Sequence, residues 1–243
     1  MRVLLFFREE RMKKFCMLRS YFSRGEQALW CGSAAVILLA FAVFDRENWL
    51  TLGASLIGVT SLIFNARGNP VGQALMVVFS LLYGMISWSF RYYGEMVTYL
   101  GMTMPMAAVA LMTWLKNPYE GNRAEVAVDR VCGCEVWLMW GLTAAVTAFF
   151  GAVLAYFQTA NLFLSTLSVS TSFLAVYLTF RRDPRYAVAY AANDVVLIAL
   201  WLLAAAEDRG YLSVAICFAA FLANDIYGFF SWQAMAARQT AKI

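Results

Sequence analysis

Residues 135–157 read EVWLMWGLTAAVTAFFGAVLAYF, and no charged residue follows Glu135 within this stretch. A helix of about 20 predominantly apolar residues is long enough to cross the hydrocarbon core of a lipid bilayer. A surface helix of a soluble protein keeps one charged or polar face, which this stretch lacks. The stretch is therefore predicted to be a transmembrane helix.

Seven further apolar runs of the same kind lie along the chain, over residues 28–44, 49–64, 71–90, 96–115, 160–180, 186–206 and 210–232. The sequence of 243 residues is 62% hydrophobic and 14% charged, with a mean hydropathy of +0.64. A soluble domain has about 25% charged residues. We therefore predict an all-α, polytopic membrane protein with eight transmembrane helices.

The basic residues are distributed unevenly between the two sides of such a bundle. If the N-terminus is cytoplasmic, sixteen of the nineteen lysine and arginine residues fall in cytoplasmic segments. The other three, Arg46, Arg91 and Arg209, fall in loops on the other side. Short cytoplasmic loops of membrane proteins are enriched in lysine and arginine. The count predicts that both termini are cytoplasmic, including a tail over residues 233–243.

Residues 1–27 combine seven basic residues with leucine, phenylalanine and tyrosine. This composition is typical of a basic amphipathic helix on the inner membrane surface. A cleavable signal peptide is the alternative, but the basic residues run through the whole segment, and no Ala-x-Ala site precedes Arg24. We interpret the segment as a surface helix that contributes to orientation.

Two three-helix repeats are predicted, over residues 49–115 and 160–232. Each begins with a helix that carries serine and threonine, and its first loop contains an Asn-Pro or Asp-Pro pair, at residues 69 and 183. Three helices reverse the direction of the chain, so one linker helix is needed to make the two repeats parallel. The span over residues 135–157 is predicted to be this linker.

Two polar pairs, Asn193-Asp194 and Asn224-Asp225, interrupt the last two apolar runs. Polar side chains within a membrane are costly, and they normally face the bundle interior or a water-filled cavity. Both pairs are expected roughly 10–12 Å from the cytoplasmic ends of their helices, at a rise of about 1.5 Å per residue. We expect the pairs to meet and to bind a solute. The alternative is that they join neighbouring helices by hydrogen bonds.

Aromatic residues flank these pairs at helical spacing. Tyr190 precedes Asn193 by three residues, and Tyr227 follows Asn224 by three. Their rings would stack on a flat solute while the polar pairs bind its hydroxyl groups. Further candidates for the substrate site are Gln73, Tyr83, Trp88 and Trp201. Five tryptophans near span ends are interpreted as interfacial anchors instead: Trp30, Trp49, Trp114, Trp137 and Trp140.

The sequence lacks the residues that several other functional classes require. It contains no histidine, and its five cysteines show no metal-ligand spacing beyond the single Cys-x-Cys at residues 132 and 134. We therefore expect neither a metal site nor a catalytic imidazole. No glycine-rich phosphate loop of the Walker type occurs, which argues against an ATPase. The expected partners are the lipid bilayer and a small solute, with no cofactor and no nucleic acid.

The layout of three, one and three helices resembles that of the SWEET sugar transporters. Three features resemble the PnuC family of nicotinamide riboside transporters: an extra N-terminal span over residues 28–44, the sequence LANDIYGFFSW over residues 222–232, and Asn193 in the preceding helix. The resemblance covers residues 49–235. The first repeat departs from the pattern, because Phe79-Ser80 stands where the second repeat has Asn193.

The resemblance implies a facilitator that takes up nicotinamide riboside (vitamin B3) across the bacterial inner membrane by alternating access, without ATP hydrolysis or ion coupling. Proton coupling through Asp194 or Asp225 stays open as an alternative. The resemblance is also compatible with a homo-oligomer such as a trimer. A carrier for another riboside, vitamin or sugar stays open, as do a non-transporting scaffold and a membrane enzyme. An enzyme would need a nucleophile, a base or metal ligands at the depth of the two polar pairs.

Overall fold

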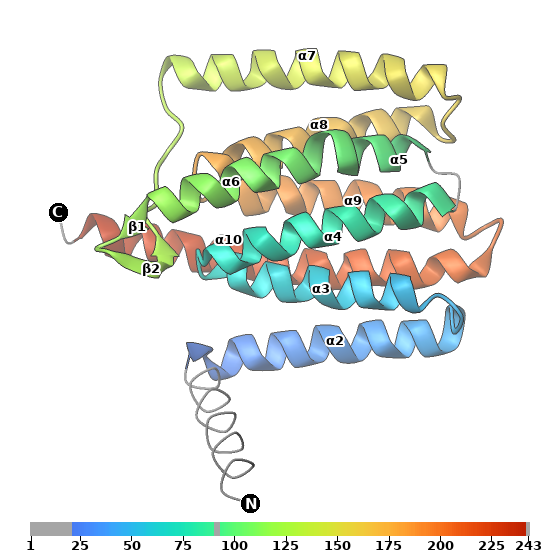
Figure 1. The fold of residues 1–243 in the computed structure, drawn as a ribbon, viewed down its shortest axis with the longest axis horizontal. Coiled ribbons are helices and arrows are strands. Elements are labelled where there is room, and N and C mark those ends of the chain that lie inside the picture. The colour runs from blue at the N-terminus through green and yellow to red at the C-terminus, as the bar shows by residue number, and fades with distance from the viewer. Residues whose placement is uncertain (1–20, 90–92, 242–243) are drawn as a thin grey trace, which may run out of the picture.

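The computed structural model describes residues 21–89 and 93–241 (Figure 1). Within these residues, eight helical segments are long and apolar enough to span a membrane, which confirms the predicted fold class and number of spans. Seven spans are single helices: α2 (Arg24–Phe44), α3 (Trp49–Ala66), α4 (Pro70–Ser89), α7 (Cys134–Tyr156), α8 (Leu162–Phe180), α9 (Tyr186–Ala204) and α10 (Leu212–Thr240). The fourth span joins α5 (Tyr93–Thr98), the π-helix η1 (Tyr99–Thr103) and α6 (Met104–Lys116).

Short elements complete the chain between these spans. The 3-10 turn η2 (Arg209–Tyr211) precedes α10, and the hairpin of β1 (Pro118–Tyr119) and β2 (Asn122–Val126) lies in the connection before α7. Helix α10 continues to Thr240, so most of the predicted tail is helical. Gln239 on this extension donates to the Val126 carbonyl and accepts from the Val128 N–H, which fixes the hairpin against α10. The surface helix is predicted over residues 1–27. Residues 1–20 of this segment lie outside the described residues.

The loops between the first two helices of each repeat have the same backbone conformation. Gly68 and Arg182 both adopt a positive φ, of 65° and 62°. The residue that follows, Asn69 or Asp183, accepts a hydrogen bond from the backbone N–H two positions later. The intervening proline is tolerated because no N–H donor is needed at the start of a helix. This shared geometry supports the internal repeat inferred from the sequence.

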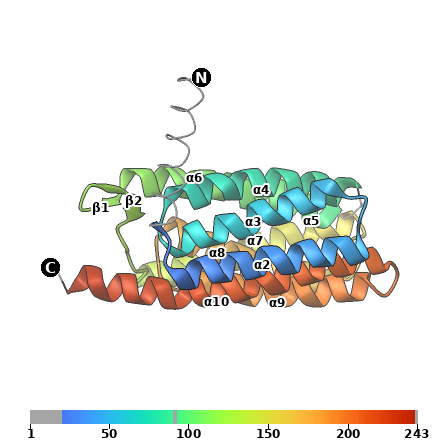
Figure 2. The same cartoon turned by 90° about the horizontal axis from the view of Figure 1, so that it is seen from below.

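The two repeats contact each other through equivalent pairs of helices. Helix α10 of the second repeat packs against α3 of the first, and α6 of the first packs against α8 of the second. Figure 2 shows α4 and α6 along one side of the bundle, with α9 and α10 along the other. The extra helix α2 and the linker α7 lie at opposite edges in Figure 1. The space between the repeats is therefore enclosed by six spans.

A pair of tryptophans joins the repeats at the end of the bundle that carries the hairpin, here called the hairpin end. Nε1 of Trp114 in α6 donates to the carbonyl of Thr179 near the end of α8, at 2.9 Å. Nε1 of Trp232 in α10 donates in the same way to Asn65 near the end of α3, at 2.7 Å. The two ring centroids lie 5.5 Å apart. These bonds hold the two halves together at this end.

The interpretation of Trp114 as an interfacial anchor is wrong, because its side chain is 0% exposed. An indole at the end of a span can equally turn inward where a backbone carbonyl on another helix accepts its N–H. The other four proposed anchors are exposed, as that role requires: Trp30, Trp49, Trp137 and Trp140.

Candidate functional site

A small cavity of about 30 Å³ lies between the two repeats. Four of the predicted site residues border it: Tyr190, Asn193 and Asp194 from α9, and Asp225 from α10. The rest of its wall is formed by Leu62, Met76, Phe79, Tyr99, Thr103, Ser172, Phe218 and Phe221. Because this wall draws on α3, α4, η1, α8, α9 and α10, both repeats contribute to the cavity.

Two carboxyl groups face this cavity from neighbouring helices. Asp194 and Asp225 are each 4% exposed, and both border this cavity. No lysine or arginine of the described chain borders the cavity, and Oδ2 of Asp194 has no hydrogen-bond partner in it. A buried carboxylate is costly unless a cation or a proton compensates its charge. The cavity therefore favours a positively charged solute.

Asn193 is held in position by two hydroxyl groups of α8. Thr171 and Ser172 both donate to its Oδ1, each at 2.9 Å. These two bonds occupy the Oδ1 atom and fix the orientation of the amide. The Nδ2 group is then the part of the side chain that can still form hydrogen bonds. None of the hydrogen bonds within the described residues uses Nδ2. Asn193 therefore offers a donor to an acceptor on a bound solute, such as a hydroxyl or an amide carbonyl.

Tyr99 and Thr103 also border the cavity, although the sequence analysis did not single them out. Both lie on the π-helix η1, and such segments occur frequently at functional sites. Pro105 lacks the N–H that an α-helix would direct to the carbonyl of Gly101, which favours the wider turn. Oγ1 of Thr103 is buried without a partner in the described chain. Gly101 and Pro105 lie within the apolar run over residues 96–115, and this interruption of the run could have indicated the site.

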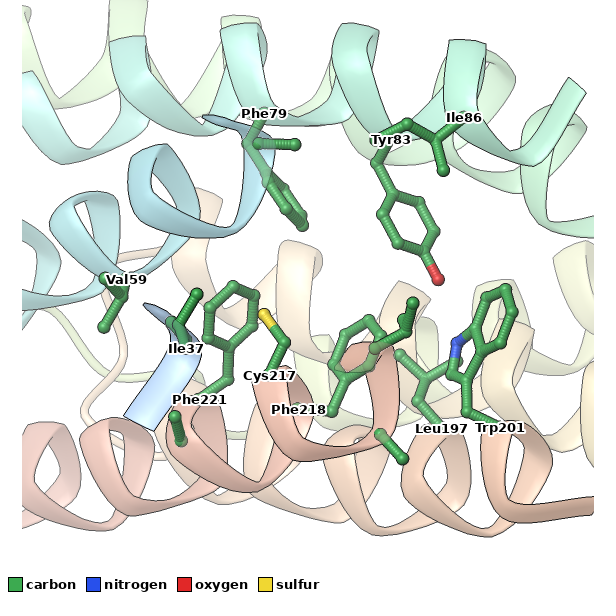
Figure 3. Packing of buried hydrophobic residues seen from close by; sticks show 14 of the residues in the cluster. Ile37, Val59, Phe79, Tyr83, Ile86, Leu197, Trp201, Cys217, Phe218 and Phe221 are labelled. Atoms are coloured by element: carbon green, nitrogen blue, oxygen red, sulfur yellow. The ribbon is translucent and has the colours of Figure 1, made fainter. Parts of the chain in front are cut away.

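A second void of about 10 Å³ lies on the side away from the hairpin end, and Phe79 and Phe218 border both spaces. Two predicted site residues, Tyr83 and Trp201, line this second void, with ring centroids 6.4 Å apart. Figure 3 shows Tyr83 extending from α4 toward Phe218 and Trp201. These rings separate the cavity from that end of the bundle. Tyr83 and Trp201 thus lie next to the cavity rather than in its wall.

The structure does not bring Asn224 into the cavity, which corrects the expectation that the two asparagines meet. Its Nδ2 donates to Oγ of Ser33 in α2 and to the Ala220 carbonyl, both at 2.8 Å. Asn224 therefore packs α10 against the extra N-terminal helix. Tyr227 is also elsewhere, since it lines a polar cleft of about 450 Å³ at the hairpin end that includes the Arg67–Glu26 ion pair.

Two further candidates on α4 do not border the cavity. Gln73 is buried and donates to Oδ1 of Asn65, which joins α4 to α3. Trp88 is 62% exposed and lies on the surface beside Tyr93. The inward face of α4 is marked by Phe79 and Tyr83, and Trp88 lies five residues further along, off that face. Neither residue is in a position to touch a solute in this cavity.

The cavity is too small for a solute the size of a nucleoside. About 30 Å³ holds roughly two water molecules, because one water needs about 10–15 Å³. Pockets that bind small organic ligands have volumes of about 300 Å³ or more. The described structure is therefore a closed state, with the tryptophan pair on one side and the aromatic cluster on the other. A solute of nucleoside size would fit beside the two carboxyl groups only if this space became larger.

Comparison with known proteins identifies similar chains. The protein is 24% identical to the nicotinamide riboside transporter PnuC of Neisseria mucosa, over 88% of this chain and 85% of that protein. It is 19% identical to the nicotinamide riboside transporter PnuC of Haemophilus influenzae, over 87% of this chain and 91% of that protein. A crystal structure of the vitamin B3 transporter PnuC has the same fold, with a TM-score of 0.78 and 22% identity over 90% of this chain and 94% of that one.

A family model described as nicotinamide mononucleotide transporter matches residues 48–234, well over half of the chain. The match includes both repeats and the linker, and so all the residues that border the cavity. The family consists of transporters rather than enzymes. The chain belongs to this family of membrane transporters, the PnuC family.

Proposed function

We propose that this protein takes up nicotinamide riboside across the bacterial inner membrane by alternating access, without ATP hydrolysis. The observation that carries this proposal is the closed cavity with two carboxyl groups and no basic residue in its described wall. The pyridinium ring of nicotinamide riboside is positively charged and flat. A carboxylate compensates the charge, and aromatic side chains such as Tyr99 and Phe221 stack well on such a ring.

The same wall argues against nicotinamide mononucleotide as the preferred solute. That compound adds a phosphate group to the riboside, and proteins bind phosphates with arginine, lysine or helix N-termini. The cavity instead presents Asp194 and Asp225, which would repel the phosphate. The riboside hydroxyls and carboxamide match the polar groups present, Asn193 and Thr103.

The transport activity predicts counterflow in liposomes. Labelled nicotinamide riboside should accumulate transiently in proteoliposomes that are preloaded with the unlabelled compound, without ATP and without an imposed proton or sodium gradient. Unlabelled riboside in the external medium should compete, whereas nicotinamide mononucleotide and the neutral nucleoside uridine should compete poorly. Liposomes without protein serve as the control. Equal competition by uridine would point to a general nucleoside carrier instead.

We further propose that the hairpin end faces the cytoplasm, together with both termini. Most of the described basic residues lie at this end, in the loops around Arg67 and Arg181 and in the hairpin connection. Only Arg46 and Arg209 lie at the opposite end of the described chain. Such a bias is expected if the hairpin end is cytoplasmic.

The orientation predicts how single cysteines react with membrane-impermeant reagents. In a background in which the native cysteines are replaced, Asn117→Cys and Arg238→Cys should be labelled only from the cytoplasmic face. Asp208→Cys, in the exposed loop before α10, should be labelled only from outside. Labelling of residues 117 and 208 from the same side would contradict the eight-span orientation.

A further inference from the structure

The polar cleft of about 450 Å³ at the hairpin end is separate from the cavity between the repeats, because no residue borders both spaces. Pockets that bind small organic ligands have volumes of about 300–1,000 Å³, so the cleft is large enough for such a ligand. Its wall combines α2, the loop after α3, β2 and α10: Tyr21, Ser23, Glu26, Arg67, Asn122, Ala124, Glu125, Tyr227, Ser231, Ala234, Met235 and Arg238. A ligand in the cleft would therefore contact both repeats.

Two ion pairs border the cleft, and in each of them the carboxylate is the more buried partner. Nε of Arg67 lies 2.9 Å from Oε1 of Glu26, and the two side chains are 30% and 3% exposed. Nη2 of Arg238 lies 2.6 Å from Oε1 of Glu125, and these side chains are 55% and 16% exposed. A ligand that enters the cleft therefore meets the guanidinium groups before the carboxylates.

The carboxylates are also bound by other donors of the protein. Oε2 of Glu26 accepts from the N–H of Ser23 at 2.7 Å, and Oε1 of Glu125 accepts from Nε2 of Gln239 at 2.9 Å. Each of the two arginines, by contrast, forms its ion pair through one nitrogen, although a guanidinium has five N–H donors. The other donors of both arginines are available to an anion in the cleft.

The guanidinium of Arg67 is held in place by Tyr21. Cζ of Arg67 lies 4.7 Å from the centroid of the Tyr21 ring, which is a favourable distance for a cation over an aromatic ring. The hydroxyl of Tyr21 donates to the Ala124 carbonyl at 3.3 Å and accepts from Nδ2 of Asn69 at 2.9 Å, so the ring is fixed as well. A binding group that is already ordered loses less entropy when a ligand binds.

We propose that this cleft is a second binding site, and that its ligand is an organic phosphate. Planar guanidinium groups bind phosphate oxygens through paired N–H bonds, and the volume leaves room for an organic group beside the phosphate. Two sources share this chemistry: a soluble phosphate ester such as a nucleotide, and the headgroup of an anionic phospholipid. The inference goes beyond the transport function and does not depend on which solute the cavity between the repeats takes.

The site is tested by calorimetric titration of the purified full-length protein in detergent at low ionic strength. Adenosine monophosphate is the soluble probe, and about one molecule is expected to bind per chain, more weakly as salt is added. Adenosine, which lacks the phosphate, should not bind. Dihexanoyl phosphatidylglycerol is the lipid probe, with dihexanoyl phosphatidylcholine, which has no net charge, as its control.

The two probes distinguish the two sources. Binding of adenosine monophosphate that phosphatidylglycerol does not displace assigns the site to a soluble phosphate ester. Binding of phosphatidylglycerol that phosphatidylcholine does not reproduce assigns it to a lipid headgroup.

Substitutions of arginine make the test specific to the cleft. Arg238→Gln should weaken binding of the probe at least about tenfold, because it removes charged donors, while Gln239 still donates to Glu125. Arg67→Lys keeps a positive charge beside Glu26 but loses the planar fork, and it should also weaken binding. Arg130→Gln is the matched control, since Arg130 is an exposed arginine of the hairpin end that does not border the cleft. This control should bind the probe as the unmodified protein does.

Two results would overturn the proposal. One is that neither adenosine monophosphate nor phosphatidylglycerol binds. The other is that Arg238→Gln and Arg130→Gln change binding to the same extent, because the probe would then respond to the overall charge of this end and not to the cleft. Counterflow of nicotinamide riboside is a separate measurement, and its failure would contradict the proposed transport function without affecting this site.

Discussion

Trp232→Ala is expected to lower the free energy of unfolding by about 3–5 kcal/mol, which is typical for truncation of a buried tryptophan. The Trp232 side chain is 0% exposed and packs between Trp114 and Tyr186, with ring centroids 5.5 Å and 4.9 Å away. Its removal also leaves the Asn65 carbonyl without the indole donor. The measurement is thermal or denaturant unfolding of the purified protein in detergent.

Matched variants separate packing from hydrogen bonding. Trp232→Phe keeps an aromatic ring but loses the N–H, so its loss of stability should be smaller, about 1–3 kcal/mol. Trp137→Ala removes a tryptophan that is 80% exposed and should change stability little. The double variant Trp114→Ala/Trp232→Ala should lose less than the sum of the single changes, because the two rings contact each other. If Trp232→Ala unfolds at the same temperature as Trp137→Ala, the Trp114–Trp232 pair does not hold the two repeats together.

The spans could be predicted from the sequence because lipid leaves little choice: each crossing needs a continuous apolar run and a helix. The direction in which each helix turns its side chains was much less predictable. Trp114 and Trp137 both lie near span ends, yet one is buried and the other is exposed. That difference depends on whether another helix presents a carbonyl, here Thr179, and the partner is 65 residues away in the chain.

Only some residues of the candidate site could be predicted from the sequence. Asp194, Asp225 and Asn193 could be chosen from the sequence because polar residues in apolar runs stand out. Thr103 could not, since a threonine is unremarkable in a span and its role depends on the local π-helix. Asn224 was assigned wrongly to the same site as Asn193. Its direction is set by Ser33 on the extra N-terminal helix, whose position against α10 is a matter of tertiary packing.

Asn193→Ala is expected to weaken binding of nicotinamide riboside by roughly tenfold to a hundredfold, whereas Asn224→Ala should leave binding within about threefold. Losing a hydrogen bond and leaving a buried solute group unpaired costs about 1–3 kcal/mol, and each 1.4 kcal/mol is a factor of about ten in affinity. Asn193 borders the cavity, and Asn224 does not. Calorimetric titration of the two purified variants measures the difference.

The effect on thermal stability should be the reverse: Asn224→Ala should lose more stability than Asn193→Ala. The hydroxyls of Thr171 and Ser172, which now donate to Asn193, can turn to carbonyls of their own helix when the amide is removed. Asn193→Ala should therefore melt within a few degrees of the unmodified protein. Asn224→Ala loses the bond that joins α10 to Ser33 in α2, so it should melt lower while it still binds the riboside. If Asn193→Ala instead melts much lower and binds normally, Asn193 is a packing contact and the solute lies elsewhere.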